Sequence, residues 1–259
     1  MLRSLWARLR QGSHTMKYPD GPPPVLSDRF RGRPLFRDDQ CRKDCSACAS
    51  ACPVGAIDPR SATVDLGKCL FCGACSAACP DHRLTHDADH RMAVASRAAL
   101  CYREREALRL ADGMAAELQS LYGRSLKLRQ VSAGGCNACE ADCNVLTTIG
   151  WDLSRFGISF VASPRHADGL LITGPVTKNM RLGLEKTYAA LPKPSVVIAV
   201  GACAISGGPY AGHEESCDGA ASVVPVDLFV PGCPPHPLTI LDGLLRFMKG
   251  EKVFHTAGA

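Results

Sequence analysis

The residues of this sequence with the clearest chemistry are its cysteines, of which there are 15 in 259 residues. Cys69, Cys72, Cys75 and Cys79 are separated by two, two and three residues, and Pro80 follows directly. Thiolates at this spacing bind 4Fe-4S clusters: three take corners of one cube, and the fourth points to a neighbouring cube. The run therefore predicts an iron–sulfur cluster site at residues 69–79.

A second run precedes it, with one more residue between its first two cysteines and with Pro53 at its end. In two-cluster ferredoxins the fourth cysteine of each run serves the other cluster. One predicted cluster is then held by Cys41, Cys45, Cys48 and Cys79, and the other by Cys52, Cys69, Cys72 and Cys75. If the longer loop displaces Cys41, the first cluster keeps a three-iron or water-exposed corner. Zinc also binds paired cysteines, but this spacing suits the corners of a cube better than one tetrahedral ion.

Four further cysteines, Cys136, Cys139, Cys203 and Cys233, each stand on a glycine-rich turn shortly after a predicted strand. In an open parallel sheet such turns emerge together at the carboxyl edge, where ligands bind. These residues, far apart in the sequence, would therefore converge on one place, and glycine lets the backbone approach a cluster closely. The pattern predicts a third, split 4Fe-4S site. The alternative is that these are structural cysteines, which are common in protein cores.

The pattern of the cysteines argues against an extracellular disulfide protein. Their number is odd, they cluster at short spacings and no secretory signal peptide opens the sequence, so we expect metal-bound thiolates in a reducing cytoplasm. No stretch approaches the roughly 18 consecutive apolar residues of a membrane-spanning helix. Residues 1–40 hold eight Lys or Arg against four Asp, which accounts for most of the net charge of +5. Although a basic arm can bind nucleic acid, no accompanying signature supports such a partner.

The elements that must position the cysteines fall into four segments, and 259 residues suffice for two domains. Residues 1–38 form a basic leader and connector, which begins with a short helix carrying Leu2, Leu5, Trp6 and Leu9 on one face. This helix either lies at a membrane interface or binds a partner, or it packs on its own domain. Residues 39–86 form the two-cluster domain, residues 87–125 have the composition of a helical linker, and residues 126–259 form an α/β domain.

In the last segment, β-rich runs alternate with helical stretches. Strands are predicted at 126–131, 158–162, 169–173, 195–200 and 223–230, and helices at 177–191 and 235–249. Such alternation is typical of a doubly wound parallel sheet with helices on its faces. The predicted fold class is therefore α/β, with an N-terminal two-cluster ferredoxin-like domain joined through the linker to a parallel sheet.

Both halves resemble known families. The stretch KYPDGPPPVLSDRFRGRPLF, with the two cysteine runs, resembles the two-cluster ferredoxin subunit of respiratory complex I and membrane-bound hydrogenases over residues 1–86. The stretches RSLKLRQV, SPRHADGLLITGPVTKNM, IAVGACAISGG and VPVDLFVPGCPPHPLTILDGLL are similar to the small subunit of group 4 nickel–iron hydrogenases and the 20 kDa subunit of complex I, over 125–249. The sequence thus resembles a fusion of the two, with a flavodoxin-like second half. The spacing of Cys136 and Cys139 matches the hydrogenase branch, on the formate-hydrogenlyase-like side.

The resemblance also implies roles for individual residues. It assigns the four split cysteines to the cluster nearest a partner large subunit, and it places the basic leader along the membrane-facing side. The family carries a glutamate where this sequence has Asp142, and Glu140 lies nearby. Either acid could couple protons, or it could simply stabilise a helix N-terminus. Cys143 is an alternative ligand one helical turn after Cys139, whereas Cys101 and Cys217 match no ligand position.

Together these features predict an electron relay through three 4Fe-4S clusters, from an electron-donor subunit to a hydrogenase or complex-I-like large subunit. No nucleophile constellation or nucleotide loop accompanies them, so the chain is expected to be an oxidoreductase subunit without its own substrate site. A complex-I-related quinone oxidoreductase subunit without nickel, and a non-catalytic cluster-delivery or assembly protein, are the alternatives. His166 and His236 are expected to pack or to support ligands. The expected location is peripheral, on the cytoplasmic face of the inner membrane, with the leader on membrane-arm subunits.

Overall fold

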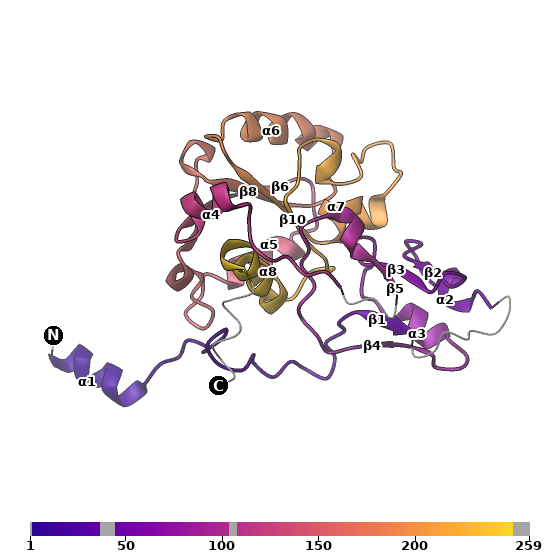
Figure 1. The fold of residues 1–259 in the computed structure, drawn as a ribbon, viewed down its shortest axis with the longest axis horizontal. Coiled ribbons are helices and arrows are strands. Elements are labelled where there is room, and N and C mark those ends of the chain that lie inside the picture. Colours follow the sequence, from indigo (N-terminus) through magenta and orange to yellow (C-terminus); the bar gives the residue numbers. More distant parts are fainter. Residues whose placement is uncertain (1, 37–44, 104–107, 251–259) are drawn as a thin grey trace.

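The computed structural model describes residues 2–36, 45–103 and 108–250. Its centre is a five-stranded parallel sheet with the strand order β10-β9-β8-β6-β7 (Figure 1). The strands are β6 (Leu126–Ser132), β7 (Ile158–Phe160), β8 (Gly169–Thr173), β9 (Val196–Val200) and β10 (Leu228–Val230). The predicted doubly wound sheet is confirmed. Strand β10 is shorter than predicted, because a short 3-10 helix (Ala220–Ser222) and a turn precede it.

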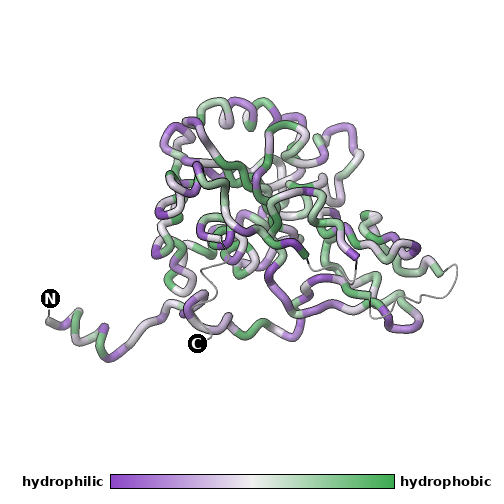
Figure 2. Tube along the Cα trace, in the orientation of Figure 1, coloured by the Kyte–Doolittle hydropathy of each residue, from purple (hydrophilic) through white to green (hydrophobic). Residues whose placement is uncertain are grey.

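Alternate residues of the strands enter two cores, one on each face of the sheet, because successive side chains of a strand point in opposite directions. Ile172 and Val197 pack in the core that also holds residues of α6 (Lys178–Ala189) and α7 (Ala202–Ser206). Leu171 and Ile198 point to the other face, toward α5 (Ala138–Val145) and α8 (Pro237–Lys249). Figure 1 shows α6 above the sheet and α5 and α8 below it, and Figure 2 shows apolar stretches gathered at the centre.

The two N-terminal cysteine runs lie in a small unit with two short antiparallel sheets. In one, β1 (Pro34–Phe36) pairs with β4 (Leu84–His86). In the other, β3 (Thr63–Asp65) lies between β2 (Ile57–Asp58) and β5 (Cys101–Arg103). The helices α2 (Ala47–Ser50) and α3 (Ala74–Ala78) pack against each other. The paired strands of this unit therefore begin before and end after the predicted boundaries at 39 and 86.

The expected helical linker is helical only in part. Its described residues include a 3-10 helix η1 (Arg97–Leu100) and the helix α4 (Ala116–Tyr122), but residues 101–103 form the strand β5. Val94 also forms an antiparallel bridge with Phe229 of β10, through backbone hydrogen bonds of 3.0 and 2.9 Å. Residues 101–103 thus form a strand where a helix was expected, because pairing with β3 outweighs local helix propensity. The other 3-10 helices are η2 (Leu153–Phe156), η3 (Pro164–His166) and η4 (Gly208–Tyr210).

The two halves share one hydrophobic core. Leu66 and Tyr102 of the N-terminal unit belong to the same buried cluster as Ile172 and Phe229 of the large sheet. A polar contact adds to it, since the Ser206 hydroxyl on α7 donates to the Gly67 carbonyl at 2.8 Å. Gly67 permits this approach, because a Cβ there would lie 2.9 Å from the Ile205 side chain. The cysteine loops of the two halves are thus held in a fixed relation.

The leader begins with α1 (Leu2–Gln11), which extends away from the rest of the molecule at the N-terminal end (Figure 1). Leu5, Trp6 and Leu9 are 60%, 63% and 83% exposed. The same helix carries basic residues, and the Arg10 guanidinium lies 4.9 Å from the centre of the Trp6 ring. Among the residues that the structure describes, no helix is long and apolar enough to cross a membrane.

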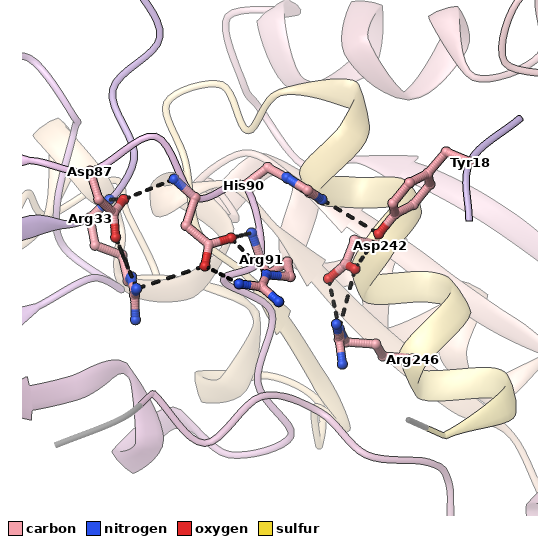
Figure 3. A network of polar contacts seen from close by, with 8 residues as sticks. Tyr18, Arg33, Asp87, His90, Arg91, Asp242 and Arg246 are labelled. Carbon is pink, nitrogen blue, oxygen red and sulfur yellow. Dashed lines mark hydrogen bonds and ion pairs between the residues drawn. The ribbon is translucent and has the colours of Figure 1, made fainter. Parts of the chain in front are cut away.

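Beyond α1, the leader is anchored to α8 by a buried polar network (Figure 3). The Tyr18 hydroxyl donates to the Asp242 carboxylate at 2.6 Å, and the Arg246 guanidinium donates to the same carboxylate at 3.0 Å. The backbone carbonyl of Tyr18 accepts from Arg155 at 2.6 Å, and His90 lies 3.4 Å from the Tyr18 hydroxyl. Burial and the neighbouring Asp242 raise the pKa of Tyr18, so this phenol remains a donor at neutral pH.

Candidate iron–sulfur cluster sites

The four cysteines of the second predicted cluster line one cavity. Cys52, Cys69, Cys72 and Cys75 all line it, together with His86. Cys52 comes directly after the C-cap residue of α2, whereas the other three lie on the loop after β3 and in α3. The first cysteine run therefore contributes its last cysteine to the cavity of the second run, as the crossed arrangement requires.

The environment of these thiols suits a sulfur-bound cluster. The backbone N–H of Ala56 donates to the Cys52 sulfur at 3.2 Å, and that of Phe71 donates to the Cys69 sulfur at 3.3 Å. Such donors stabilise negative charge on sulfur ligands. Burial raises the pKa of the Cys69 thiol to about 12, with smaller contributions from Cys75, Cys52 and Cys72. Four thiols that line one cavity are a donor set for an iron–sulfur cube, which binds them without their protons.

Three residues of the first predicted cluster are described, and Cys41 lies outside the described residues. Cys48 is a buried residue of α2, Cys45 lies two residues before that helix, and Cys79 is the C-cap of α3. The Cys79 sulfur accepts from the backbone N–H of Arg83 at 3.3 Å. Although burial alone would raise the pKa of Cys79, backbone donors at Leu84, Arg83 and Asp81 lower it below its usual value. The same backbone donors would stabilise negative charge on a Cys79 sulfur that binds a cluster.

The split site lies at the carboxyl edge of the large sheet. Cys136 comes shortly after β6, Cys139 lies in the first turn of α5, Cys203 is in α7 after β9, and Cys233 follows β10. Gly201 brings two of these segments together, because a Cβ there would lie 2.6 Å from the Cys139 sulfur. The backbone of Gly201, at a φ of +92°, also requires glycine.

The thiols of the split site influence one another. Burial, followed by Cys233 and Cys136, raises the pKa of Cys203 to about 11. Burial also raises the pKa of Cys139, with contributions from Glu140, Cys143, Cys203 and Cys233. Cys136 and Cys233 are exposed, whereas Cys139 and Cys203 are half-buried. The structure thus brings the four cysteines together at a site that is open on one side.

The two acids near the split site have different surroundings. The Glu140 carboxylate is 6% exposed and accepts from the hydroxyls of Ser132 at 2.6 Å and Thr173 at 2.7 Å. Burial alone would raise the pKa of Glu140, but these two hydroxyls hold it below its usual value. Burial raises the pKa of Asp142, which lines a cavity of about 310 Å³ with Cys233. Of the two acids, Asp142 is the one whose surroundings favour proton uptake.

The remaining cysteines have other surroundings. Cys143 is fully buried in the core between α5, α8 and the sheet, which is typical of a structural residue. Cys101 is exposed at the start of β5, and Cys217 is half-buried. His166 is exposed in η3, whereas His236 caps α8 by accepting from the Leu238 N–H at 3.1 Å. Across the described ranges, no three His, Cys, Asp or Glu side chains are grouped closely enough to hold a single metal ion.

The second cavity and the split site are adjacent. Burial, with contributions from Cys136 and Cys72, raises the pKa of the Cys233 thiol, so Cys72 lies within electrostatic range of the split site. The cavity beside Cys233 is also lined by Leu70 and Phe71 of the cluster loop. Of the first predicted cluster, none of the three described ligands borders this cavity. The second predicted cluster is therefore next to the split site.

One residue of the second cavity was not singled out from the sequence. His86 lies on β4, and its side chain reaches the cavity because β4 pairs with β1 beside α3. Its only sequence signal is its place seven residues after Cys79. Tyr18 and Asp242 were also missed, since their contact joins residues 224 positions apart.

Sheet and cysteine sites together define an iron–sulfur protein with a ferredoxin-type half and a flavodoxin-like half, and sequence comparison agrees with both. Residues 136–247 match the family described as NADH ubiquinone oxidoreductase, 20 kDa subunit, and residues 62–82 match a 4Fe-4S binding domain. A probable membrane-bound hydrogenase subunit of Pyrococcus furiosus is 41% identical over 145 residues, which are 52% of this chain and 86% of that protein. The chain belongs to this 20 kDa subunit family.

Two further relatives represent both branches of the resemblance. Formate hydrogenlyase subunit 7 of Escherichia coli is 42% identical over 132 residues, which cover 50% of this chain and 51% of that protein. An NADH-quinone oxidoreductase subunit of Clostridium beijerinckii is 38% identical over 122 residues, covering 47% of this chain and 71% of that protein. The expected fusion is thereby confirmed: a 4Fe-4S segment precedes a domain of the 20 kDa family in one chain.

Proposed function

We propose that this chain is the electron-relay subunit of a membrane-associated hydrogenase or complex-I-like oxidoreductase, and that it holds three 4Fe-4S clusters. The first would be held by Cys41, Cys45, Cys48 and Cys79, the second by Cys52, Cys69, Cys72 and Cys75, and the third by Cys136, Cys139, Cys203 and Cys233. Bound clusters would supply one-electron redox chemistry, while the protein sets their spacing, burial and potential.

The observation that carries this proposal is that the second cavity and the split site lie next to each other. The second cavity contains Cys52 from the first run, and Leu70 lines both this cavity and the cavity beside Cys233 of the split site. The split site is open toward the outside at Cys136 and Cys233. Electrons would enter at the first cluster and leave at the third, where a partner large subunit would cover the exposed ligands. The shared core keeps this order fixed.

The experiment is iron and sulfide analysis of the anaerobically reconstituted full chain, with EPR of the reduced protein. We expect about twelve iron atoms per chain, from three four-iron clusters. Cys203→Ser should lower this number to about eight and remove one EPR signal. Cys217→Ser is the matched control and should leave both unchanged. A wild-type content of about eight or fewer, with an EPR spectrum unaffected by Cys203→Ser, would contradict the proposal.

The second candidate is a subunit of a complex-I-related quinone oxidoreductase without nickel, and the likeness to the Clostridium NADH-quinone oxidoreductase protein favours it. The spacing of Cys136 and Cys139 instead favours the hydrogenase branch. Nickel analysis of the complex purified with its partners separates the two, because only a hydrogenase large subunit would contribute nickel.

We further propose that the leader attaches the chain to the membrane arm on the cytoplasmic face of the inner membrane. Three apolar side chains of α1 are exposed beside basic residues, an arrangement that suits an interface between lipid headgroups and acyl chains. The Tyr18 network fixes the following part of the leader to α8, so the attached helix would orient the whole chain.

A further inference from the structure

The side chain of His86 has an unusual environment within the second cavity. Its Nδ1 lies 3.0 Å from the Ser76 hydroxyl on α3. Its Nε2 is buried and has no hydrogen-bond partner among the described protein groups. A buried polar atom without a partner costs free energy, so it calls for an explanation such as a redox role or a bound group that it contacts. His86 lines the same cavity as Cys52, Cys69, Cys72 and Cys75.

The chemistry of that cavity determines which nitrogen of the His86 ring carries the proton. Thiolates and inorganic sulfides accept hydrogen bonds but cannot donate them, so a nitrogen that faces them must carry hydrogen. A neutral imidazole with hydrogen on Nε2 leaves Nδ1 as an acceptor. The Ser76 hydroxyl, at 3.0 Å, can donate to that acceptor. Ser76 thereby selects the tautomer that presents an N–H to the cavity.

We propose that His86 donates a hydrogen bond from Nε2 to a sulfur of the cluster held by Cys52, Cys69, Cys72 and Cys75, and that this bond raises the reduction potential of that cluster alone. The inference rests on the proposed second cluster and names a further residue that tunes it. The bond stabilises the reduced state, which carries one more negative charge, more than the oxidised state.

The position of this cluster gives the bond a role in the relay. The second cavity lies next to the split site. The reduction potential of the second cluster would therefore determine how readily this cluster is reduced before it passes the electron to the third. None of the described ligands of the first predicted cluster lines the cavity that His86 lines. The histidine therefore changes one step of the relay without replacing a ligand.

The experiment uses the anaerobically reconstituted full chain and follows each cluster by EPR during a redox titration. His86→Leu removes the donor at similar volume and should shift one midpoint potential downward. The expected change is about tenfold in the reduction equilibrium, which is ~59 mV for a one-electron couple. His86→Gln keeps an amide N–H near the position of Nε2 and should restore most of the potential. His82→Asn is the matched control, since His82 is exposed just before β4, at a φ of +50° that asparagine tolerates.

A second measurement detects the bond itself. In the wild type, pulsed ENDOR should show an exchangeable proton coupled to the second cluster, and exchange into D2O should remove that signal. The signal should be absent in His86→Leu and present in His82→Asn. If His86→Leu does not bind its cluster, the exchangeable-proton signal is compared between the wild type and His86→Gln, before and after exchange into D2O.

Two results would overturn the inference. One is an unchanged set of potentials with the exchangeable proton retained in His86→Leu. The other is a nitrogen coupling of ligand strength together with a full iron content in Cys52→Ser, which would make His86 a ligand and not a donor. Failure of the proposed function looks different. In that case the wild type itself lacks a cluster that depends on Cys69 and Cys75, whatever residue occupies position 86.

Discussion

At the scale of residues, the cysteine runs carry most of the information. Their spacing is local, so sequence alone indicates which thiols of a run can share a cube. The split cysteines needed one further assumption, that predicted strands end at a common edge, and the structure brings all four to that edge. His86 could not be predicted in this way, because its relation to the thiols depends on the pairing of β1 with β4.

Glycine at position 201 determines how closely the segments that carry the split cysteines can approach each other. At Gly201, Gly201→Ala would place a methyl group 2.6 Å from the Cys139 sulfur. The methyl group must push Cys139 away from its neighbours, so we expect the variant to lose most of the third cluster and about four iron atoms per chain. Iron analysis with EPR checks this expectation.

The control for this prediction separates steric contact from backbone strain. Gly212 has a φ of +77°, similar to that of Gly201, but a Cβ there would meet nothing within 4 Å. Gly212→Ala should therefore keep full iron content. If both variants lose iron equally, backbone strain and not contact with Cys139 accounts for the effect.

At the scale of elements, periodicity predicted the large sheet well but did not predict the strand β5 within the linker. The strands of the sheet are apolar runs bounded by turns, and all five lie where such runs occur. Residues 90–103 have helical composition, yet they bridge Phe229 at Val94 and pair with β3 at β5. A single sequence window contains no information about these distant partners, which outweigh a weak local preference.

The attachment of the leader to α8 depends on one buried hydrogen bond. Tyr18→Phe removes the donor that reaches the Asp242 carboxylate at 2.6 Å. Because hydrogen bonds to charged groups contribute about 1.5–3 kcal/mol, we expect the free energy of unfolding to fall by about 2 kcal/mol. Thermal unfolding of the cluster-loaded chain measures this loss.

The same variant should also loosen the leader. Lys17 is exposed next to the anchor, so trypsin should cleave after it faster in Tyr18→Phe. Tyr210→Phe is the control, because Tyr210 is 50% exposed and should affect neither measurement. Unchanged cleavage in Tyr18→Phe would mean that the Arg155 contact with the Tyr18 carbonyl holds the leader by itself.

At the scale of the whole molecule, the fusion is more than a tether. A tether would only raise the effective concentration of two domains. Here the ferredoxin-type half contributes Leu66 and Tyr102 to a core shared with the large sheet, and Val94 extends that sheet at β10. Sequence comparison indicates two families in one chain, but it does not indicate a common core, which arises only from tertiary contacts. The adjacency of the second cavity and the split site depends on this shared core.

The orientation of the whole molecule depends on α1. Leu5, Trp6 and Leu9 together expose an apolar face beside arginines. Inserted into a membrane interface, each side chain contributes about 1.5–3 kcal/mol when fully buried, and the arginines favour anionic headgroups.

We expect the full chain to float with phosphatidylcholine vesicles that contain phosphatidylglycerol, and to float less with vesicles that lack phosphatidylglycerol. Replacing all three residues with serine should weaken this association more than tenfold, whereas the same change at Ile149 and Leu182, which are 77% and 58% exposed, should not. Added salt should weaken the wild type because it screens the arginines. Equal flotation of both variants would mean that α1 is not the membrane-facing element.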